Sequence, residues 1–288
     1  MKTRSKKRAW LLACGAGAAV AAYAFLVEPR WLQMRRATVH LRDLPGDLEG
    51  LRIGLLTDLH AEPGRSLELV SRAVTALAAE EPRIVAVTGD FIGPKMESFR
   101  PVLEEIARLA PPHGIYAVPG NHDHIRGIER WRRELAEFGS IVDLTNRSRV
   151  LDVGRARLCL AGVDDFAEGR PSLDSLPPPE TRDLTILLAH NPDQAERARR
   201  ALDRVDLVLS GHTHGGQVRL PAVGALVSSV ERGDLYEAGL RRRPWTQVYT
   251  SRGLGTVHIP ARLLTRPEVT VLELTSAPRP PRRRGLGL

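Results

Sequence analysis

Cysteine, lysine and aromatic residues are all scarce in this sequence, and their scarcity argues against a disulfide framework and against a nucleic-acid partner. Two cysteines, Cys14 and Cys159, give no basis for a disulfide framework. Aromatic residues make up only 5% of the chain, too few to predict the stacking surface with which a nuclease holds a strand. Of the 42 basic residues behind the net charge of +8, 38 are arginines, and these are scattered along the chain. We therefore expect no nucleic-acid partner and attribute the charge to surface solvation and membrane proximity.

Five short apolar runs predict buried β-strands. They are residues 53–56, 84–87, 115–118, 185–188 and 207–210. Polar residues follow each run closely. In open α/β sheets the ligand crevice lies beyond the carboxyl ends of the strands, so we expect these polar residues to meet at one edge.

The polar residues form short motifs with the chemistry of metal ligands. The motifs are Asp58-Leu59-His60, Gly89-Asp90, Gly120-Asn121-His122-Asp123, His190 and Gly211-His212-Thr213-His214. Asp58 and His60 stand two residues apart, so in an extended chain their side chains would project to the same side. Carboxylate, imidazole and amide ligands suit divalent Mn, Fe or Zn. A single Asp or His is usually structural, but five of the nine histidines lie in these motifs, which predicts a two-metal site. The other four are interpreted as structural: His40, His113, His124 and His258.

In this order the motifs resemble the pattern of the calcineurin-like metallophosphoesterase superfamily, D-x-H, G-D, G-N-H-D/E, a single His and G-H-x-H. Every motif is present without substitution. The resemblance implies that one divalent ion is bound by Asp58, His60 and His214. It implies that a second ion is bound by Asn121, His190 and His212, with Asp90 bridging the two.

The same resemblance implies a chemical role for the residues beside these ligands. Two such ions would activate a hydroxide and polarise the phosphoryl oxygens, which favours displacement at phosphorus. His122 would stabilise the developing charge and protonate the leaving oxygen, and Asp123 would orient its imidazole. The sequence thus predicts a metal-dependent phosphoric ester hydrolase.

The resemblance also implies an α/β fold, with two packed mixed β-sheets flanked by helices in a four-layer αββα sandwich. Apolar residues spaced three or four apart predict helices between the strands. These helices are expected at residues 67–80, 102–109, 128–138 and 193–202. Later apolar segments suggest a second sheet, from residues 157–162, 247–249 and 269–274.

A charge-free segment, residues 9–27, follows a basic N-terminus and nearly spans a hydrocarbon core of about 30 Å. We interpret it as an uncleaved single transmembrane helix, because a signal peptide has a shorter apolar core and a small-residue cleavage site. The expected division is an anchor in residues 1–35, one catalytic domain in residues 36–275 and a disordered Pro/Arg-rich tail in residues 276–288.

Basic residues are more numerous before the anchor than after it, so the positive-inside rule predicts an extracytoplasmic catalytic domain. The cytoplasmic face remains the alternative. The substrate that a further resemblance suggests favours this alternative. The chain resembles bacterial membrane-anchored phosphodiesterases that are similar to enzymes that hydrolyse UDP-2,3-diacylglucosamine in lipid A synthesis. That resemblance rests on the anchor, on Thr57-Asp58-Leu59-His60, on residues 211–217 and on Ser251-Arg252-Gly253-Leu254-Gly255. A nucleotide-activated lipid is a substrate of the cytoplasmic face, so the two predictions conflict.

Three functions remain open after the sequence. The first is a membrane-anchored phosphodiesterase or pyrophosphatase acting on a phosphate ester that is lipid-linked. The second is a broad extracytoplasmic phosphatase or nuclease. The third is a non-catalytic membrane adaptor, which is disfavoured because every expected ligand is intact.

Overall fold

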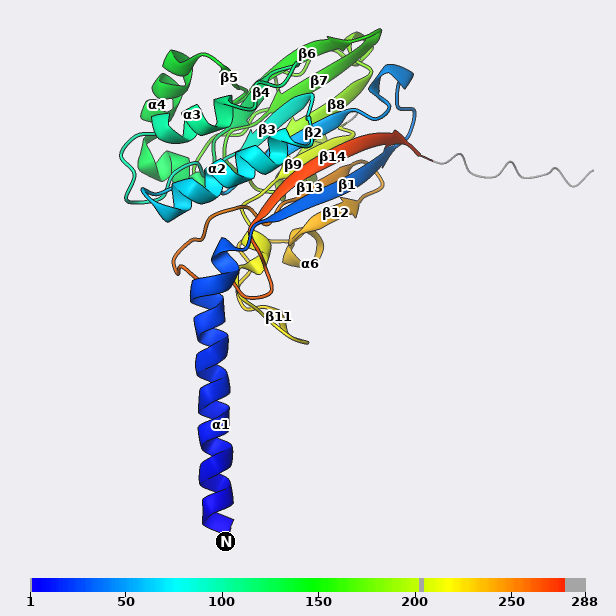
Figure 1. Ribbon diagram of the computed structural model, residues 1–288. Coiled ribbons are helices and arrows are strands. Elements are labelled where there is room, and N and C mark those ends of the chain that lie inside the picture. Colours follow the sequence, from blue (N-terminus) through cyan, green and yellow to red (C-terminus); the bar gives the residue numbers. More distant parts are fainter. Residues whose placement is uncertain (1, 202–204, 278–288) are drawn as a thin grey trace, which may run out of the picture.

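The computed structural model describes residues 2–201 and 205–277. Two six-stranded sheets pack face to face, and helices cover their outer faces (Figure 1). This is the αββα sandwich that the resemblance of the motifs implied. A long N-terminal helix stands away from the sandwich.

The first sheet has the strand order β1-β14-β2-β3-β4-β5 and is parallel except between β14 and β2. Its strands are β1 Gln33–Leu41, β14 Glu268–Ser276, β2 Arg52–Leu56, β3 Ile84–Thr88, β4 Ile115–Val118 and β5 Ile141–Asp143. Its outer face is covered by helices α2 Arg65–Ala78, α3 Arg100–Ala107 and α4 Asn121–Phe138. Leu56 and Val87 of the sheet belong to one buried cluster with Val74 of α2 and Trp131 of α4.

The second sheet has the order β12-β13-β9-β8-β7-β6, with antiparallel pairs at its two ends and parallel pairs between them. Its strands are β12 Gly239–Arg242, β13 Gln247–Thr250, β9 Leu207–Ser210, β8 Leu184–Leu188, β7 Ala156–Gly162 and β6 Arg147–Val153. Helices α5 Gln194–Ala201 and α6 Gly233–Tyr236 pack on its outer face through Ala195, Ala198 and Tyr236. A small hairpin, β10 Arg219–Leu220 and β11 Gly224–Ala225, projects from the sandwich.

The main core lies between the two sheets. Leu55 and Ala86 of the first sheet share a buried cluster with Ile186 and Leu209 of the second. The five apolar runs are confirmed as strands β2, β3, β4, β8 and β9. The expected membership of the second sheet is wrong at one point, because residues 269–274 form β14 of the first sheet, between β1 and β2.

Helix α4 starts earlier than the apolar spacing predicted. It begins at Asn121, inside the third motif, and is interrupted at Gly127, whose φ of 115° lies outside the helical region. The expected helix at residues 128–138 is therefore only the part beyond this kink. The apolar spacing could not reveal the first turns, because they carry the polar motif instead of core residues.

The N-terminal helix α1, Lys2–Ala22, continues through Tyr23–Val27 and Glu28–Arg30 into β1. Residues Trp10–Arg30 form a helical segment long and apolar enough to cross a bilayer. Its described side chains are almost all exposed in the structure, including Trp10 and Leu12. Beyond residue 277, the expected basic tail lies outside the described residues.

Candidate metal centre

The candidate ligands come from loops at the carboxyl ends of strands in both sheets. Strands β2, β3 and β4 of the first sheet and β8 and β9 of the second lead into these loops. In chain order the candidate ligands are Asp58, His60, Asp90, Asn121, His190, His212 and His214. We expected a single sheet edge, whereas the residues meet where the edges of two packed sheets face one another. The packing of the sandwich therefore completes the group.

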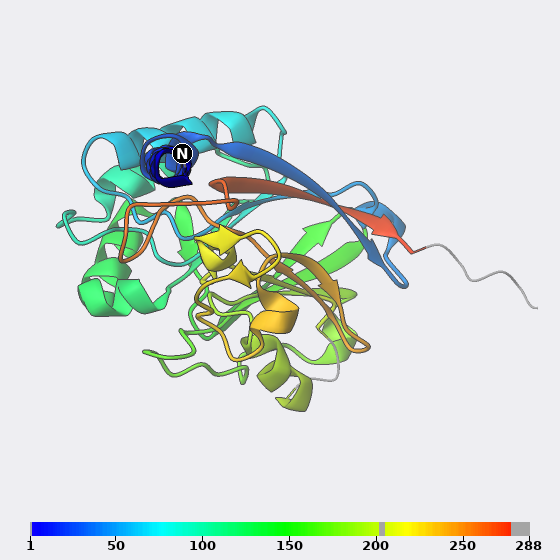
Figure 2. The same ribbon diagram turned by 90° about the horizontal axis from the view of Figure 1, so that it is seen from below.

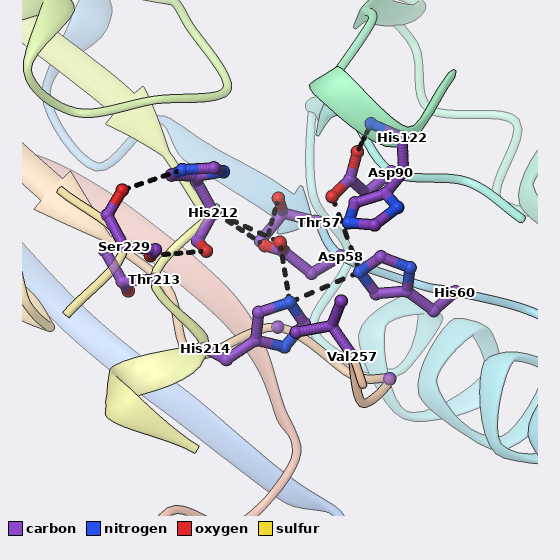
Figure 3. Close-up of polar contacts among 12 residues, drawn as sticks. Thr57, Asp58, His60, Asp90, His122, His212, Thr213, His214, Ser229 and Val257 are labelled. Carbon is purple, nitrogen blue, oxygen red and sulfur yellow. Dashed lines mark hydrogen bonds and ion pairs between the residues drawn. The ribbon is translucent and has the colours of Figure 1, made fainter. Parts of the chain in front are cut away.

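Asp58, His60, His214 and Asp90 form a first cluster. Nε2 of His60 lies 3.2 Å from Nε2 of His214, which lies 3.3 Å from Oδ1 of Asp58 (Figure 3). Oδ2 of Asp90 lies 3.4 Å from Nε2 of His60. Ligand atoms bound about 2.1 Å from a tetrahedral ion are about 3.4 Å from one another. These spacings fit four ligands around one cation.

Asn121, His190, His212 and again Asp90 form a second cluster. Oδ1 of Asn121 lies 3.2 Å from Nε2 of His190 and 3.1 Å from Nδ1 of His212. The two imidazole nitrogens are 3.1 Å apart, and Nε2 of His190 is 3.2 Å from Oδ2 of Asp90. Because Oδ2 of Asp90 borders both clusters, it is the atom that could bridge two ions.

The donor set of the second cluster fits a metal ion better than a hydrogen-bond network. Nδ1 of His190 faces the carbonyl of Thr88 at 2.7 Å, and Nε2 of His212 faces the carbonyl of Ser229 at 3.1 Å. A carbonyl only accepts, so in each neutral imidazole the proton is on that outer nitrogen. The inner nitrogens are then acceptors, and they face the oxygen of Asn121 and a carboxylate. Such outward hydrogen bonds are usual for metal-binding histidines.

The charges within the site keep Asp90 ionised. Burial opposes its ionisation, but the charges of His190, His60 and His122 and a hydrogen bond from His190 hold its pKa below the ordinary value. Burial opposes protonation of His190, but the charge of Asp90 raises its pKa, so a proton occupies this imidazole where no cation does. Burial, together with His60 and Arg262, holds the pKa of His214 well below its ordinary value. The site thus combines a buried carboxylate with a neutral imidazole, as cation binding requires.

The backbone of the site is strained. Five of the seven candidate ligands have a positive φ, and they are Asp58, His60, Asp90, His212 and His214. Residues other than glycine rarely adopt this left-handed region, and such strain concentrates at functional sites. The extended-chain argument for Asp58 and His60 is therefore wrong in its reason. The two side chains converge because both residues are left-handed, with φ of 49° and 40°.

His122 lies at the edge of the first cluster and borders an open cavity. Its ring is 4.9 Å from that of His60, edge to face, and its backbone N–H donates to Oδ1 of Asp90 at 2.9 Å. The imidazole is half-buried and lines a cavity of about 1030 Å³ that also reaches His60. The ring is thus next to the candidate metal site and open to a substrate.

Asp123 makes different contacts from those expected. Its fully buried carboxylate accepts the backbone N–H groups of Asp90 at 2.7 Å, Phe91 at 2.9 Å and Gly120 at 2.9 Å. Among the described residues it makes no hydrogen bond to the imidazole of His122. Burial and the neighbouring Asp90 raise the pKa of Asp123 to about 7. Its contacts fix the loop that carries Asp90 and the start of α4.

Two residues near the site were not singled out by the motifs. Asp165 follows β7 just as the ligands follow their strands. Its charge helps to raise the pKa of His190 and opposes the lowering of the pKa of His212. Its buried Oδ2 has no hydrogen-bond partner among the described residues. Arg262 is fully buried, with its guanidinium donating to the carbonyl of Arg252 and lying 3.4 Å from Nδ1 of His214. The position of Asp165 after an apolar run was a usable signal, whereas nothing local marks Arg262.

The chain is similar to a known family and to several known proteins. A family model described as calcineurin-like phosphoesterase matches residues 51–216, more than half of the chain. The phosphodiesterase YaeI of Escherichia coli is 34% identical over 260 residues, which cover 88% of this chain and 92% of that one. The metallophosphoesterase YkuE of Bacillus subtilis is 30% identical over 258 residues, covering 88% and 89%. A transmembrane protein with metallophosphoesterase domain from Danio rerio is 30% identical over 250 residues, covering 83% of this chain and 56% of that one.

The chain therefore belongs to the calcineurin-like phosphoesterase family. It is a phosphoester hydrolase of the two-metal type.

Proposed function

We propose that this protein is a membrane-anchored phosphodiesterase or pyrophosphatase that hydrolyses an anionic, lipid-linked substrate at the bilayer surface. The observation that carries the proposal is the course of the cavity beside His122. It extends from His60 and His122 to Phe25, Pro29 and Arg30 at the end of the apolar N-terminal helix. A substrate held in lipid by one end could thus have its phosphoester group near the candidate ligands.

The charge of the cavity supports a phosphate-rich substrate. Glu62 and Glu68 are its two carboxylates. Five cationic side chains also line it, and they are Arg30, Arg65, Arg72, Lys95 and Arg126. Lys95 is paired with Glu62 at 3.2 Å, which leaves an excess of arginine. Arginine binds phosphate through two parallel N–H groups, so this lining favours a pyrophosphate or phosphodiester over a neutral ester.

The proposed chemistry uses the two clusters and His122. When bound, two divalent ions supply an activated water and polarise the phosphoryl oxygens. The first ion would be held by the first cluster and the second by the second cluster, with Asp90 shared. His122 would bind the phosphoryl group and give a proton to the leaving oxygen. Asp123 would keep the loop that carries Asp90 in position during the reaction.

The membrane attachment is supported by the segment Trp10–Arg30 and by relatives whose names include a transmembrane protein with metallophosphoesterase domain. Trp10 and Trp31 flank the segment, and tryptophan is enriched at both bilayer interfaces. The distribution of basic residues favours an extracytoplasmic catalytic domain. A cytoplasmic domain would instead fit a nucleotide-activated lipid such as UDP-2,3-diacylglucosamine.

The test compares three substrates with the full chain in detergent micelles and added Mn²⁺. UDP-2,3-diacylglucosamine represents the lipid-linked class, and bis-p-nitrophenyl phosphate and p-nitrophenyl phosphate represent soluble diesters and monoesters. Asp90→Ala serves as the inactive control. A strong preference for the lipid substrate would support the proposal and require a cytoplasmic domain. Activity confined to the soluble esters would refute the lipid-linked substrate tested and favour a broad extracytoplasmic phosphoesterase.

A further inference from the structure

Exposed apolar side chains gather in two segments on one side of the domain. Beyond Trp31, eight large apolar residues are exposed in the described chain, and six of them lie in residues 220–227 and 259–264. We call these six the apolar rim, and they are Leu220, Val223, Leu226, Val227, Ile259 and Leu264. Val223 and Val227 are 70% and 74% exposed. Single exposed apolar residues are ordinary, but a gathering of this kind marks an interaction surface.

The two segments of the apolar rim form one surface. The backbone N–H of Arg219, at the base of the β10–β11 hairpin, donates to the carbonyl of Leu263 at 2.9 Å. The N–H of Leu263 donates to the carbonyl of Gln217 at 3.0 Å. These bonds join the hairpin to the loop that carries Ile259 and Leu264. The rim is therefore held as a unit by backbone hydrogen bonds.

The end of the N-terminal helix is fixed to the same loop. The N–H of Arg262 donates to the carbonyl of Ala24 at 3.0 Å, and the N–H of Thr265 donates to Oε1 of Glu28 at 2.5 Å. Arg266 donates to the carbonyl of Trp31 at 3.1 Å. Because Glu28 is itself buried, this junction is a packed contact and not a free tether. The direction of α1 relative to the domain is thereby set.

The apolar rim lies on the side of the domain from which α1 extends. In Figure 1 the hairpin at β11 descends below the sandwich, on the same side as α1. Seen from below in Figure 2, the hairpin and the 256–264 loop lie in the foreground near the axis of α1. A bilayer crossed by α1 would therefore meet the rim.

We propose that the apolar rim is a second membrane contact. Its side chains lie in the interfacial region of the bilayer that α1 crosses. This inference rests on the proposed membrane attachment and deepens the proposed function. Ile259 belongs both to the rim and to the wall of the cavity that reaches His60 and His122. Contact at the rim would hold the mouth of that cavity against the lipid surface, where a lipid-linked phosphoester could enter without leaving the bilayer.

The continuity of the rim with the end of α1 favours lipid over a protein partner. A protein partner that covered the rim would have to fit between the domain and the bilayer that α1 crosses. Exposed apolar residues beside the end of α1, next to a basic junction that includes Arg30, are typical of segments that lie at the boundary between lipid headgroups and acyl chains.

The first experiment measures the depth of the rim in a bilayer with the full chain. In a Cys14→Ala background the remaining Cys159 is buried, so one cysteine introduced as Val227→Cys can be labelled with the fluorophore NBD. The matched control is Val150→Cys, at an exposed valine of β6 on the far side of the domain. Both are reconstituted in vesicles of equal parts phosphatidylcholine and phosphatidylglycerol that carry spin-labelled acyl chains.

We expect NBD at position 227 to be quenched at least about threefold more strongly than at position 150, because interfacial segments lie within reach of the acyl chains. Equal quenching at the two positions would overturn the inference. A blue-shifted but unquenched signal at position 227 would also overturn it, since it would indicate contact with protein, including a second copy of this chain.

A second experiment separates failure of this inference from failure of the proposed function. The double variant Val223→Asp, Val227→Asp should hydrolyse bis-p-nitrophenyl phosphate at the rate of the unaltered protein. Its hydrolysis of a lipid-linked phosphodiester embedded in vesicles should fall about tenfold, because interfacial binding scales with the buried apolar area and anionic lipid repels an added carboxylate. Equal rates on the embedded substrate would contradict the inference. If the unaltered protein cleaves no phosphoester at all, the proposed function fails while the quenching result stands on its own.

Discussion

The carboxylate of Asp123 accepts the backbone N–H of Asp90 at 2.7 Å, and so the motif after β4 fixes the residue that borders both candidate metal clusters. The same carboxylate also binds Gly120 and Phe91. These contacts join the loops after β3 and β4 at one buried carboxyl group. The geometry of the site therefore depends on a residue that is not itself among the candidate ligands.

Asp123→Asn should weaken metal binding. An amide has one acceptor oxygen and an NH₂ group, which would face backbone N–H donors that the carboxylate now satisfies. We expect metal affinity to fall about 10–100-fold, as is typical for groups that orient ligands. Titration with Mn²⁺, followed by hydrolysis of a soluble diester, measures this. Unchanged affinity would mean that the loop of Asp90 holds its position without Asp123.

His122→Ala should reduce turnover while metal remains bound. The proposed role of the imidazole is to protonate the leaving oxygen, a contribution of about 10²–10⁴-fold in kcat. His113→Ala is the matched control, since His113 lies before β4, at the opposite end of that strand. Metal content and kcat are measured on both variants. Loss of metal in His122→Ala would make His122 a ligand and contradict the proposed role.

Gly211→Ala should disturb the first cluster through steric overlap. A Cβ built at Gly211 overlaps Oγ1 of Thr57 and Oδ2 of Asp58, both of which are buried. Relief of this overlap would displace the Asp58 carboxylate, so we expect loss of metal and activity with the fold retained. At Gly46 a Cβ meets nothing within 4 Å, so Gly46→Ala should be silent. Full activity of Gly211→Ala would show that Asp58 can move without cost.

His212 should make the metal-free protein sensitive to acid. Burial and the charge of His190 lower its pKa from 6.5 to about 4. Between these values the folded state binds fewer protons at this residue than the unfolded state, so stability falls as the pH is lowered from 6.5 towards 4. Above pH 6.5 this residue contributes no pH dependence.

His212→Asn removes that titration. In EDTA, the fall in Tm between pH 7 and pH 4 should therefore be smaller for His212→Asn than for the unaltered protein. Identical falls in Tm would contradict the assigned pKa.

The parts of this fold that could be predicted from the sequence are those fixed by local apolar pattern. The runs that became β2, β3 and β8 are buried on both sides, so their composition alone marks them as strands. The position of β14 was missed because its pairing with β1 and β2 joins the two ends of the domain. No local pattern specifies a pairing over that sequence distance.

The candidate ligands could be identified from the sequence because each follows an apolar run. Their backbone conformation could not be predicted in this way. The left-handed φ of Asp58 and His60 depends on tertiary hydrogen bonds, in which their N–H groups donate to the carbonyls of Gly89 and Asp90 at 3.0 and 2.9 Å. Likewise, the contacts of Asp123 depend on the loop after β3 lying against the start of α4. Such long-range contacts override local preference and appear only in the folded chain.

The most direct test of the two-metal site is the metal content of the purified full chain, compared with Asp90→Ala. Elemental analysis after loading with Mn²⁺ and gel filtration should find about two ions per chain in the unaltered protein, together with hydrolysis of bis-p-nitrophenyl phosphate. Asp90→Ala should lose both the stoichiometry and the activity, because Oδ2 of Asp90 borders both clusters. Two ions retained in Asp90→Ala with full activity would contradict the account.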